Sequence, residues 1–511
     1  LAPDTERTLT LDGPITAGPH QVFGGKGKVT GGFATSPVLP QWWGAVGDGK
    51  HDDAPAFNAA LQLSLTAGAV AIQVPRGDYR IAGRLRIYRN THLRFDPGAT
   101  LVRGWAAGFF TNGDNGGSYP GYSGHGSIVI EGGTLDGNVG EFADEYVAMS
   151  FGHAEDITIR GLTIRDVIWG HAIEVNACRR VTISDCRFLG YRDAADGSRS
   201  FSEAIQLDVP TKLSFPAFGP WDGTPCRDVT IANCHFGPSG TDNTTSWACG
   251  VGSHGCIHDV WTSGVRIIDN VFDRTTWYAI RPFKWNDCVI TGNVLTDCAG
   301  GITHSTPAPD TESSKDKDGV QQGVAQGSAR ILIADNIISG TSTSAAISAY
   351  GRPDAGPEQV QIHGNQIIGT KSNAIHATYC RGLQVSDNMV HQASGHGVRL
   401  EQVEGFAVDD NWIDEVSVEK EGASDGINLV GCRAGVVRHN AVRPGGQRYG
   451  FAADADCEDV TSSANLLAGT SGPYLAESDS TRDQVELYAP SGTRFALTVS
   501  DDGELTAAPV E

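Results

Sequence analysis

The chain has 511 residues, among them 65 glycines and only two methionines, and its formal net charge is −22. Such a negative charge argues against nucleic acid as a partner, because DNA and RNA are polyanions. No stretch approaches the roughly 18 apolar residues of a membrane span, so we expect no membrane partner. The glycine content and the shortage of long helical runs favour many short strands joined by turns.

The first predicted element is an amphipathic helix within residues 45–68. Asp52 or Asp53 can cap its N-terminus, and it ends near Gly68. We expect this helix to cover the first of the strands that follow, because unpaired strand edges promote aggregation. The N-terminal strands and the helix together are predicted to occupy residues 1–70.

One pattern recurs from about residue 90 onward, a short β-rich run followed by a turn residue and another apolar residue. Examples are VTISDCRF at 181–188, ILIADNII at 331–338 and LQVSDNMV at 383–390. One column of this repeat contains two cysteines and then asparagines, with steps of 23 residues between Asn365, Asn388 and Asn411. The column members are Cys186, Cys234, Asn270, Asn293, Asn336, Asn365, Asn388, Asn411, Asn440 and Asn465.

Short strands at such regular spacing cannot each bury a face alone, but stacked coils share one core. A coil of about 23 residues with three short strands indicates an all-β, right-handed parallel β-helix, which we predict for residues 71–470. Leucine-rich repeats are the alternative, but their leucine spacing is absent. The last residues, 471–511, alternate like antiparallel strands and are predicted to form a C-terminal cap or an oligomer contact.

Two segments extend this interpretation to a family. WWGAVGDGKHDDAPAFNAALQ at 42–62 resembles the N-terminal signature of the pectate-lyase-like β-helix superfamily, which includes many phage tailspikes. The closing GTRFALTVSDDGELT is also similar to tailspike sequences. The resemblance implies a carbohydrate-active protein with a polysaccharide or oligosaccharide partner, and often a homotrimer.

A second strand recurs in each coil as a small residue followed by an inward aliphatic residue, as in HAIEVN, EAIQLD, CGVGSH and YAIRPF. Because side chains alternate across a strand, residues one and three positions after the aliphatic should point outward. The aligned columns gather ionisable residues on four consecutive coils. These residues are His171, Glu174, Glu203, Asp208, His254, Tyr278 and Arg281.

Three acids in this set suggest glycosidic bond hydrolysis, which needs one protonated carboxyl and one carboxylate. Glu174 and Asp208 lie one coil apart and two residues along, so their backbones should be roughly 8 Å apart. Glu203 and Asp208 are five residues apart on one strand, roughly 16 Å when extended, so we expect that they are not direct partners. A solvated strand face is the alternative reading of the same residues.

The remaining candidate residues would bind the substrate or adjust the protonation of the acids. His254 could adjust the acid–base balance, and Arg281 could bind an acidic sugar or hold a carboxylate. Sugar platforms are predicted at the aromatic and cationic residues near these strands, with loop packing as the alternative for each tryptophan. The predicted substrate-binding residues are His171, Trp247, Trp277, Tyr278, Lys284 and Trp285.

GVGSHG at 250–255 and YAIRPFKW at 278–285 are also similar to the histidine and Arg-x-Lys segments of polygalacturonase-type hydrolases. The match is partial. His254 falls at a different point of its strand, Lys284 stands one position late, and only Glu203 occupies a place of the family's paired aspartates. This resemblance implies related carbohydrate chemistry rather than polygalacturonase activity itself.

Three insertions, at 209–226, 237–248 and 305–328, are predicted to flank the same surface, the last as a mobile lid. Cys186 and Cys234 share a column, as do Cys178 and Cys226, which fits either disulfides or a buried thiol ladder. The eleven cysteines show no metal-like spacing, so no zinc site and no cofactor are predicted.

The leading hypothesis is a polysaccharide-degrading glycoside hydrolase, of the inverting type, that uses Glu174, Glu203 and Asp208. The alternatives are a polysaccharide lyase that uses Arg281, Lys284, His254 or Tyr278, a fructan-type glycosyltransferring enzyme, and a non-catalytic glycan-binding spike. The chain begins at Leu1 without methionine. We therefore expect a processed, secreted protein, with trimming of a cytoplasmic one as the alternative.

Overall fold

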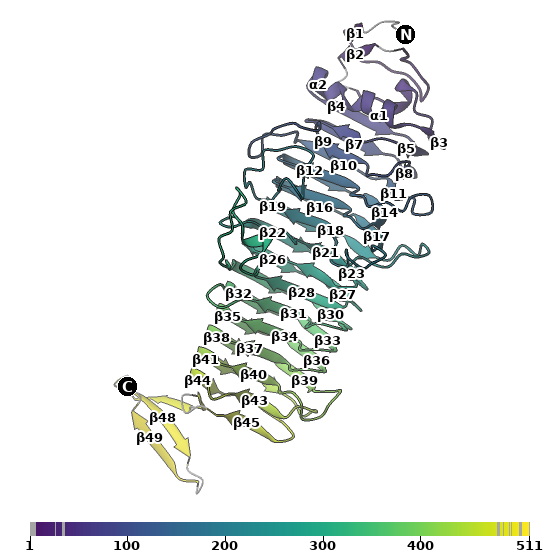
Figure 1. The fold of residues 1–511 in the computed structure, drawn as a ribbon. Coiled ribbons are helices and arrows are strands. Elements are labelled where there is room, and N and C mark those ends of the chain that lie inside the picture. Colours follow the sequence, from purple (N-terminus) through teal and green to yellow (C-terminus); the bar gives the residue numbers. More distant parts are fainter. Residues whose placement is uncertain are drawn as a thin grey trace. The chain divides into compact units, whose positions relative to one another are not determined.

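The computed structural model describes residues 7–25, 27–32, 36–477, 481–483, 485–489, 491, 493–499 and 503–509. Figure 1 shows these residues as a ribbon built mostly of short strands. They form two compact units. Unit 1 contains the described residues up to Ala299 together with Pro307–Gln326, and unit 2 contains Gly300–Thr306 and the described residues from Gly327 onward. No helix among the described residues is long and apolar enough to cross a bilayer.

The predicted helix is present at the N-terminal end of unit 1 as α1 (Ala54–Leu61) and α2 (Leu63–Ala67). The Asp52 carboxylate accepts the backbone N–H of Ala54 at 3.1 Å, while Asp53 holds the preceding turn by accepting the N–H of Val46 at 2.7 Å. Gly68 ends the helix with a φ of 79°, a left-handed conformation that glycine adopts without strain. Two short elements precede the helix, the parallel pair β1 (Thr8–Leu11) and β2 (Lys28–Gly31) and the 3₁₀ turn η2 (Pro40–Trp43).

Three parallel sheets build the coils of unit 1. The first sheet is β4 (Val70–Val74), β7 (Thr91–Phe95), β10 (Ile128–Glu131), β13 (Glu155–Arg160), β16 (Arg179–Ser184), β19 (Arg227–Ala232), β22 (Thr262–Ile268) and β26 (Cys288–Thr291), with β25 (Trp285–Asn286) beside β22. The second is β3 (Asp48–Asp52), β5 (Gly77–Ile81), β8 (Ala99–Arg103), β11 (Thr134–Asp136), β14 (Thr163–Ile168), β17 (Arg187–Arg192), β20 (His235–Gly237), β23 (Val271–Asp273) and β27 (Val294–Thr296). The third is β6 (Leu85–Ile87), β9 (Phe110–Asn112), β12 (Met149–Gly152), β15 (Ile173–Asn176), β18 (Glu203–Asp208), β21 (Cys249–Gly252) and β24 (Tyr278–Arg281).

Unit 2 repeats the plan. Its first sheet is β29 (Ala329–Ala334), β32 (Glu358–His363), β35 (Arg381–Ser386), β38 (Glu404–Asp409), β41 (Arg433–Arg438), β44 (Glu458–Ser463) and β46 (Thr481–Asp483). The second is β30 (Ile337–Ser339), β33 (Gln366–Thr370), β36 (Met389–Ala393), β39 (Trp412–Val416) and β42 (Ala441–Val442). The third is β28 (Gly300–Ser305), β31 (Ile347–Tyr350), β34 (Ile375–Thr378), β37 (Val398–Glu401), β40 (Ile427–Val430), β43 (Tyr449–Ala453) and β45 (Gly472–Ala476).

The C-terminal strands β47 (Val485–Tyr488), β48 (Arg494–Val499) and β49 (Leu505–Pro509) pair antiparallel, as the alternation of the sequence predicted. The inserted segment Pro307–Gln326 contains the single-turn η3 (Glu312–Ser314). Both units therefore have the predicted all-β parallel β-helix architecture; a helix precedes most of the coil strands of unit 1, and antiparallel strands follow the coils of unit 2 in the chain.

The asparagine column stabilises the corner of each coil. In unit 2 the side-chain oxygen of Asn388 accepts the backbone N–H of Asn365 at 3.0 Å and its side-chain N–H at 2.9 Å, and Asn411 does the same for Asn388. The pattern satisfies buried polar groups coil by coil. In unit 1 the same corner contains Asn270 bonded to Asn293, and Cys234 donates its N–H to Asn270.

The predicted cysteine column is a thiol ladder and not a set of disulfides. All eleven cysteines are buried thiols. Cys186 and Cys234 lie against backbone carbonyls at the asparagine position. Beside this corner, Phe188, Phe236 and Phe272 stack in register with ring centroids 4.9 Å and 4.6 Å apart.

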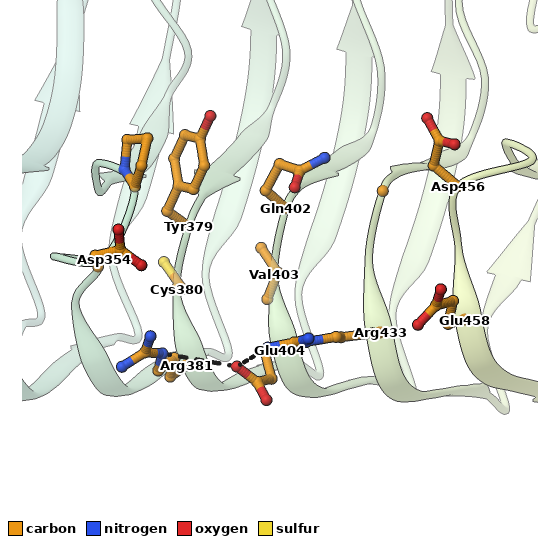
Figure 2. A pocket seen from close by; sticks show the side chains of 13 residues that line it. Asp354, Tyr379, Cys380, Arg381, Gln402, Val403, Glu404, Arg433, Asp456 and Glu458 are labelled. Carbon is orange, nitrogen blue, oxygen red and sulfur yellow. Dashed lines mark ion pairs between the residues drawn. The ribbon is translucent and has the colours of Figure 1, made fainter.

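A second ladder runs along the first sheet of unit 2, where the sign of the charge alternates from coil to coil. The paired positions are Glu358, Arg381, Glu404, Arg433 and Glu458. Figure 2 shows Arg381 and Arg433 converging on Glu404, at nitrogen–oxygen distances of 3.7 Å and 2.9 Å. These groups border a surface hollow of about 410 Å³, whose arginines are already paired with acids.

Candidate active site

The third sheet of unit 1 brings the predicted site residues into the register that the sequence alignment gave. Glu174 pairs with Gln206, which pairs with Gly252, which pairs with Arg281. In the neighbouring column Asn176 pairs with Asp208. Gly252 is required here because a Cβ at this position would lie 2.8 Å from the Arg281 carbonyl oxygen and 3.3 Å from Cγ of Glu203.

Glu203 and two histidines form the centre of the site. The Glu203 carboxylate is fully buried, and its Oε2 lies 2.9 Å from Nδ1 of His254 and 3.7 Å from Nδ1 of His171. His171 Nδ1 also lies 2.8 Å from the Glu203 carbonyl oxygen. The rings of His171 and His254 stack with centroids 5.6 Å apart, while Phe201 meets the His254 ring edge-on at 5.0 Å.

The charges in this cluster follow from burial and from the contact between Glu203 and His254. Burial alone would raise the pKa of Glu203, but His254, His171 and Arg281 outweigh it and hold that pKa below its usual value. Burial would lower the pKa of His254, but the Glu203 carboxylate raises it to about 9. Burial lowers the pKa of His171 to about 4. Near neutral pH the pair is therefore a carboxylate and an imidazolium beside a neutral imidazole.

Asp208 is connected to this centre through Gln206. The Gln206 amide nitrogen donates to Oδ2 of Asp208 at 2.8 Å and lies 3.2 Å and 3.3 Å from the two ring nitrogens of His254. Asp208 is 1% exposed, and its Oδ1 has no hydrogen-bond partner among the described residues. Burial raises the pKa of Asp208 to about 7, and the negative charge of Glu203 adds to that increase against the opposing effect of His254.

Glu174 is the third carboxyl and is partly exposed on β15. Its Oε2 accepts a hydrogen bond from the Ser150 hydroxyl at 2.9 Å. Burial raises the pKa of Glu174 to about 7, the Ser150 hydrogen bond opposes that rise, and the nearby Asp208 adds to it. Glu174 and Asp208 are thus two neighbouring carboxyls that titrate in the same range.

Arg281 lies at the edge of the acid cluster. Its Nη1 donates to the Ser253 carbonyl oxygen at 2.5 Å, and its guanidinium packs over Trp277 and Phe283 at 4.8 Å and 4.6 Å. Trp277 and Tyr278 remain partly exposed beside it. These two aromatic residues keep their predicted place as a surface that could contact a sugar ring.

Other predicted binding residues are buried and do not face this surface. Trp247 is 0% exposed and packs on Tyr191, and Trp285 is 1% exposed and donates its indole N–H to the Ser253 hydroxyl. The prediction that these tryptophans are sugar platforms is therefore wrong for this structure, and loop packing, the alternative, is correct. His171 is also buried, at 2% exposed, so it supports the centre rather than the surface.

Lys284 likewise belongs to the scaffold. It is 1% exposed, and its Nζ donates to the Ile257 carbonyl oxygen at 2.8 Å and to Oε1 of Gln326 at 2.6 Å. Its φ of 57° turns the chain at this residue. Its predicted role as a substrate-binding residue is corrected to that of an anchor between the β24 loop and the end of the inserted segment Pro307–Gln326.

The inserted segments lie along both edges of the third sheet: 209–226 and Pro307–Gln326 follow strands of this sheet and lead to the first sheet, whereas 237–248 leads from the second sheet into it. In the 209–226 segment the buried Phe218 packs on Tyr119 at 5.2 Å, and Asp222 accepts the N–H of Gly121 at 2.9 Å. The 237–248 segment is tied to the second sheet, where the hydroxyl of Thr241 donates to Asp166. The segment Pro307–Gln326 reaches Lys284 and the backbone of His258.

Three residues of the site were not predicted from the sequence: Gln206, Ser150 and Ser253. Gln206 stood in the outward column, and its position between Glu174 and Gly252 was the available signal. Ser150 pairs with Glu174 in register, so the same column extended by one coil would have found it. Ser253 had no signal, since it lies beyond the end of β21.

The metal-binding capacity of the site is limited by its own hydrogen bonds. Ligand atoms of His171, Glu203 and His254 lie within 4.8 Å of one another. The facing atoms are nevertheless engaged, since His254 contacts the Glu203 carboxylate and His171 contacts the Glu203 carbonyl oxygen. We read the cluster as imidazole–carboxylate pairing, and the absence of a metal stays a prediction.

Known proteins are similar to this chain both in sequence and in fold. A family model described as rhamnogalacturonase A/epimerase, pectate lyase-like, matches residues 42–143, and one described as the right-handed β-helix region matches residues 317–467. The plasmin and fibronectin-binding protein A of Streptococcus pneumoniae is 28% identical over 288 residues, which is 51% of this chain and 39% of that protein. The chain thus spans about two fifths of the length of this relative.

Two solved structures share the fold. The family 28 exopolygalacturonase of Yersinia enterocolitica gives a TM-score of 0.57 at 12% identity, covering 80% of this chain and 79% of that one. The tailspike of E. coli bacteriophage HK620, in complex with a pentasaccharide, gives 0.56 at 11% identity, covering 92% and 83%. At such low identity these two likenesses concern the fold alone.

Proposed function

This chain is a member of the pectate-lyase-like right-handed parallel β-helix superfamily, and from that premise we propose that it hydrolyses glycosidic bonds of a polysaccharide. The observation that carries the proposal is the pair of neighbouring carboxyls of Glu174 and Asp208, one coil apart beside the ionised Glu203. The pKa of Glu203 is lowered, whereas those of Glu174 and Asp208 are raised to about 7. Two interacting carboxyls that titrate in the same range lose their protons in two steps, so near neutral pH one can hold a proton as the acid while the other is ionised as the base.

Asp208 acts as the general acid in this proposal, and because its carboxyl is 1% exposed behind Gln206, that side chain must move aside for the glycosidic oxygen to reach it. When it gives its proton to the glycosidic oxygen, the resulting carboxylate is stabilised by the Gln206 amide N–H and by the nearby His254 imidazolium. Glu203 keeps His254 protonated and is therefore a positioning residue, not the acid or the base. Its buried place beneath His254 supports that role.

Glu174 acts as the general base and takes a proton from water as the water oxygen attacks the anomeric carbon. The register places Glu174 one coil and two residues from Asp208, so their backbones are about 8 Å apart. Both side chains point outward from neighbouring coils, so we expect their carboxyls to keep a similar separation, within the roughly 6.5–9.5 Å that leaves room for a water and gives inversion. The bond to the leaving oxygen breaks as the new carbon–oxygen bond forms, and a proton passes back from Glu174 to Asp208 through solvent.

The test is a polysaccharide panel followed by variants of the two acids. We expect saturated products with new reducing ends and an inverted anomeric configuration by NMR. Asp208→Asn should regain much of its rate on an aryl glycoside with a good leaving group, because such a group needs no acid. Glu174→Gln should not regain it, and Asp318→Asn, an exposed acid, should behave as the unchanged protein. Ultraviolet-absorbing unsaturated uronides would instead identify a lyase.

A second function is favoured by the streptococcal relative, whose name records binding to plasmin and fibronectin. In this alternative the chain is a surface protein that binds glycan or protein without cleavage. Binding of plasmin and fibronectin to the unchanged chain, with no product from any polysaccharide, would establish it. Both functions place the protein outside the cell, in agreement with a relative that binds extracellular proteins and with the tailspike fold.

A further inference from the structure

Unit 2 has a polar cluster of its own on its third sheet. His376 on β34 pairs in register with Arg399 on β37, which pairs with Asn428 on β40. In the adjacent column Thr378 pairs with Glu401. This places a cation and two hydrogen-bonding side chains on consecutive coils, where the neighbouring Ser348 and Ala452 are small.

Two acids hold two arginines in fixed positions. Asp425 is fully buried and accepts hydrogen bonds from Nε and Nη2 of Arg448 at 3.0 Å and 2.9 Å and from the Asn428 amide at 2.8 Å. Glu401 accepts from Nε of Arg399 and lies 3.1 Å from His376. Arg399 and Arg448 nevertheless keep 30% and 42% of their side chains exposed.

These arginines line a hollow of about 310 Å³, a volume at the lower end of ligand sites. Ala452, Ala453 and Leu475 contribute apolar surface to its lining, and Asp454 and Glu477 contribute acids. A guanidinium has five N–H donors, and no hydrogen bond within the described part of the chain uses Nη2 of Arg399 or Nη1 of Arg448.

An unpartnered amide atom gives a second, independent indication. Asn428 lines the hollow and is 8% exposed, and its Oδ1 has no hydrogen-bond partner among the described residues. Leaving a buried amide oxygen unpaired lowers the stability of the folded state, because the oxygen loses its hydrogen bonds to water. Burying the Asp425 carboxylate also carries a desolvation cost, which its ion pair only balances. A network that served only stability would include neither an unpaired amide oxygen nor a buried carboxylate.

From these contacts we infer that the hollow of unit 2 binds a sugar residue that carries a carboxylate. Arg399 and Arg448 would hold the carboxylate through their unused N–H groups, since guanidinium–carboxylate hydrogen bonds are among the strong ones. Asp454 and Glu477 would accept hydrogen bonds from sugar hydroxyls, and the apolar lining would contact the C–H face of the ring. The site lies in unit 2 and does not depend on the hydrolysis proposed for unit 1.

The experiment is equilibrium binding of tetragalacturonate, tetramannuronate and a glucuronate-containing tetrasaccharide, each beside its methyl ester, which has the same shape without the charge. The full chain is used with Asp208→Asn present, so that turnover cannot remove the ligand. We expect at least one acidic oligosaccharide to bind. Its Kd should rise at least about tenfold in Arg399→Gln and in Arg399→Gln/Arg448→Gln.

The matched control is Arg381→Gln/Arg433→Gln, which removes two acid-paired and more exposed arginines from the first sheet of unit 2. It should leave the Kd unchanged. Arg399→Gln alone keeps the buried Asp425–Arg448 pair, so its folding is protected if the double variant is unstable. Equal binding in Arg399→Gln and the control, equal binding of acid and ester, or no binding of any acidic probe would each overturn the inference. None of these outcomes bears on whether unit 1 hydrolyses its substrate.

Discussion

Glu203 and His254 show how one buried contact sets the charge of a whole site. The carboxylate keeps the imidazole protonated, and the imidazolium opposes the rise in pKa that burial gives Asp208. Neither group needs to touch a substrate to influence the reaction. Removing one partner should therefore be visible on the other by spectroscopy, with or without a known substrate.

We expect Glu203→Gln to lower the pKa of His254 from about 9 to its ordinary value of about 6.5 or below, because burial would then act without an opposing carboxylate. The measurement is NMR titration of ¹³C-labelled histidine. Glu401→Gln, beside His376 in unit 2, is the matched control and should leave His254 unchanged. A His254 that still titrates near 9 in Glu203→Gln would show that another group holds its proton.

The raised pKa of Asp208 also predicts a dependence of stability on pH. Its folded pKa of about 7 lies above the ordinary value of 3.8, so between these values the folded state binds more protons than the unfolded state. This group therefore makes the free energy of unfolding fall as pH rises from about 4 to about 7. Asp208→Asn should be more stable than the unchanged chain at pH 8, on the order of 1–3 kcal/mol.

Urea unfolding of both proteins at pH 5 and at pH 8 measures this effect. The gain should be larger at pH 8, because Asp208 is mostly protonated at pH 5. Asp318→Asn, an exposed acid in the segment Pro307–Gln326, should not change stability at either pH. If Asp208→Asn showed the same pH dependence as the unchanged chain, Asp208 would not be titrating in that range.

Part of this site could be predicted from the sequence and part could not. Alternation of side chains along a strand gave the register of Glu174, Gln206, Gly252 and Arg281, because the period of two is strict. The distance of roughly 16 Å expected between Glu203 and Asp208 applies to their backbones and not to their side chains. Their side chains both turn toward His254, which lies past the end of β21, where no period applies.

The substrate-binding roles predicted for Lys284, Trp247 and Trp285 were wrong for a related reason. Lys284 follows β24 with a left-handed φ of 57°, so the chain turns there and alternation no longer tells which way the side chain points. Trp247 lies at the end of the 237–248 insertion and Trp285 in β25, and each is covered by contacts with distant residues, Tyr191 for Trp247 and Ser253 for Trp285. A sequence does not show this covering, because it depends on contacts between distant segments.

At the scale of elements, each coil depends on the next through the asparagine corner. Asn388→Leu should lower the free energy of unfolding by about 1–3 kcal/mol, because the backbone N–H of Asn365 would lose its acceptor in a buried place. Chemical denaturation followed by circular dichroism measures the change. Gln384→Ala, an exposed residue of the same coil, is the control and should have little effect; equal stability of both variants would contradict the role of the ladder.

The segment Pro307–Gln326 is held at its end by the buried Lys284. In Lys284→Met the hydrogen bonds to Gln326 and to the Ile257 carbonyl oxygen disappear, so the segment should open more often. We expect faster tryptic cleavage after Lys315 and Lys317, identified by mass spectrometry. Lys371→Met, an exposed lysine of unit 2, should leave the rate unchanged, and an unchanged rate in Lys284→Met would exclude the anchor.

At the scale of the whole molecule, the net charge of −22 acts on any charged substrate before it arrives. An acidic polysaccharide is repelled at long range, and salt screens that repulsion within about 10 Å at 0.1 M. We expect kcat/KM for an acidic substrate to increase between about 10 mM and about 150 mM salt, and to stay constant for a neutral one. A decrease would show that local cations such as Arg281 govern the encounter.

The homotrimer implied by the resemblance to tailspikes stays a prediction. Light scattering of the full chain would measure its oligomeric state.

The alternating ladder of Glu358, Arg381, Glu404, Arg433 and Glu458 limits how the length of this fold can change. Deleting residues 381–403 removes one coil and leaves the asparagine corner continuous, but it places Glu358 directly beside Glu404. Deleting residues 381–432 removes two coils and places Glu358 beside Arg433, so opposite charges meet again. Because the sign of the charge alternates from coil to coil along this face, removing or adding one coil brings like charges together. Gains or losses of two coils should therefore be tolerated more readily than those of one.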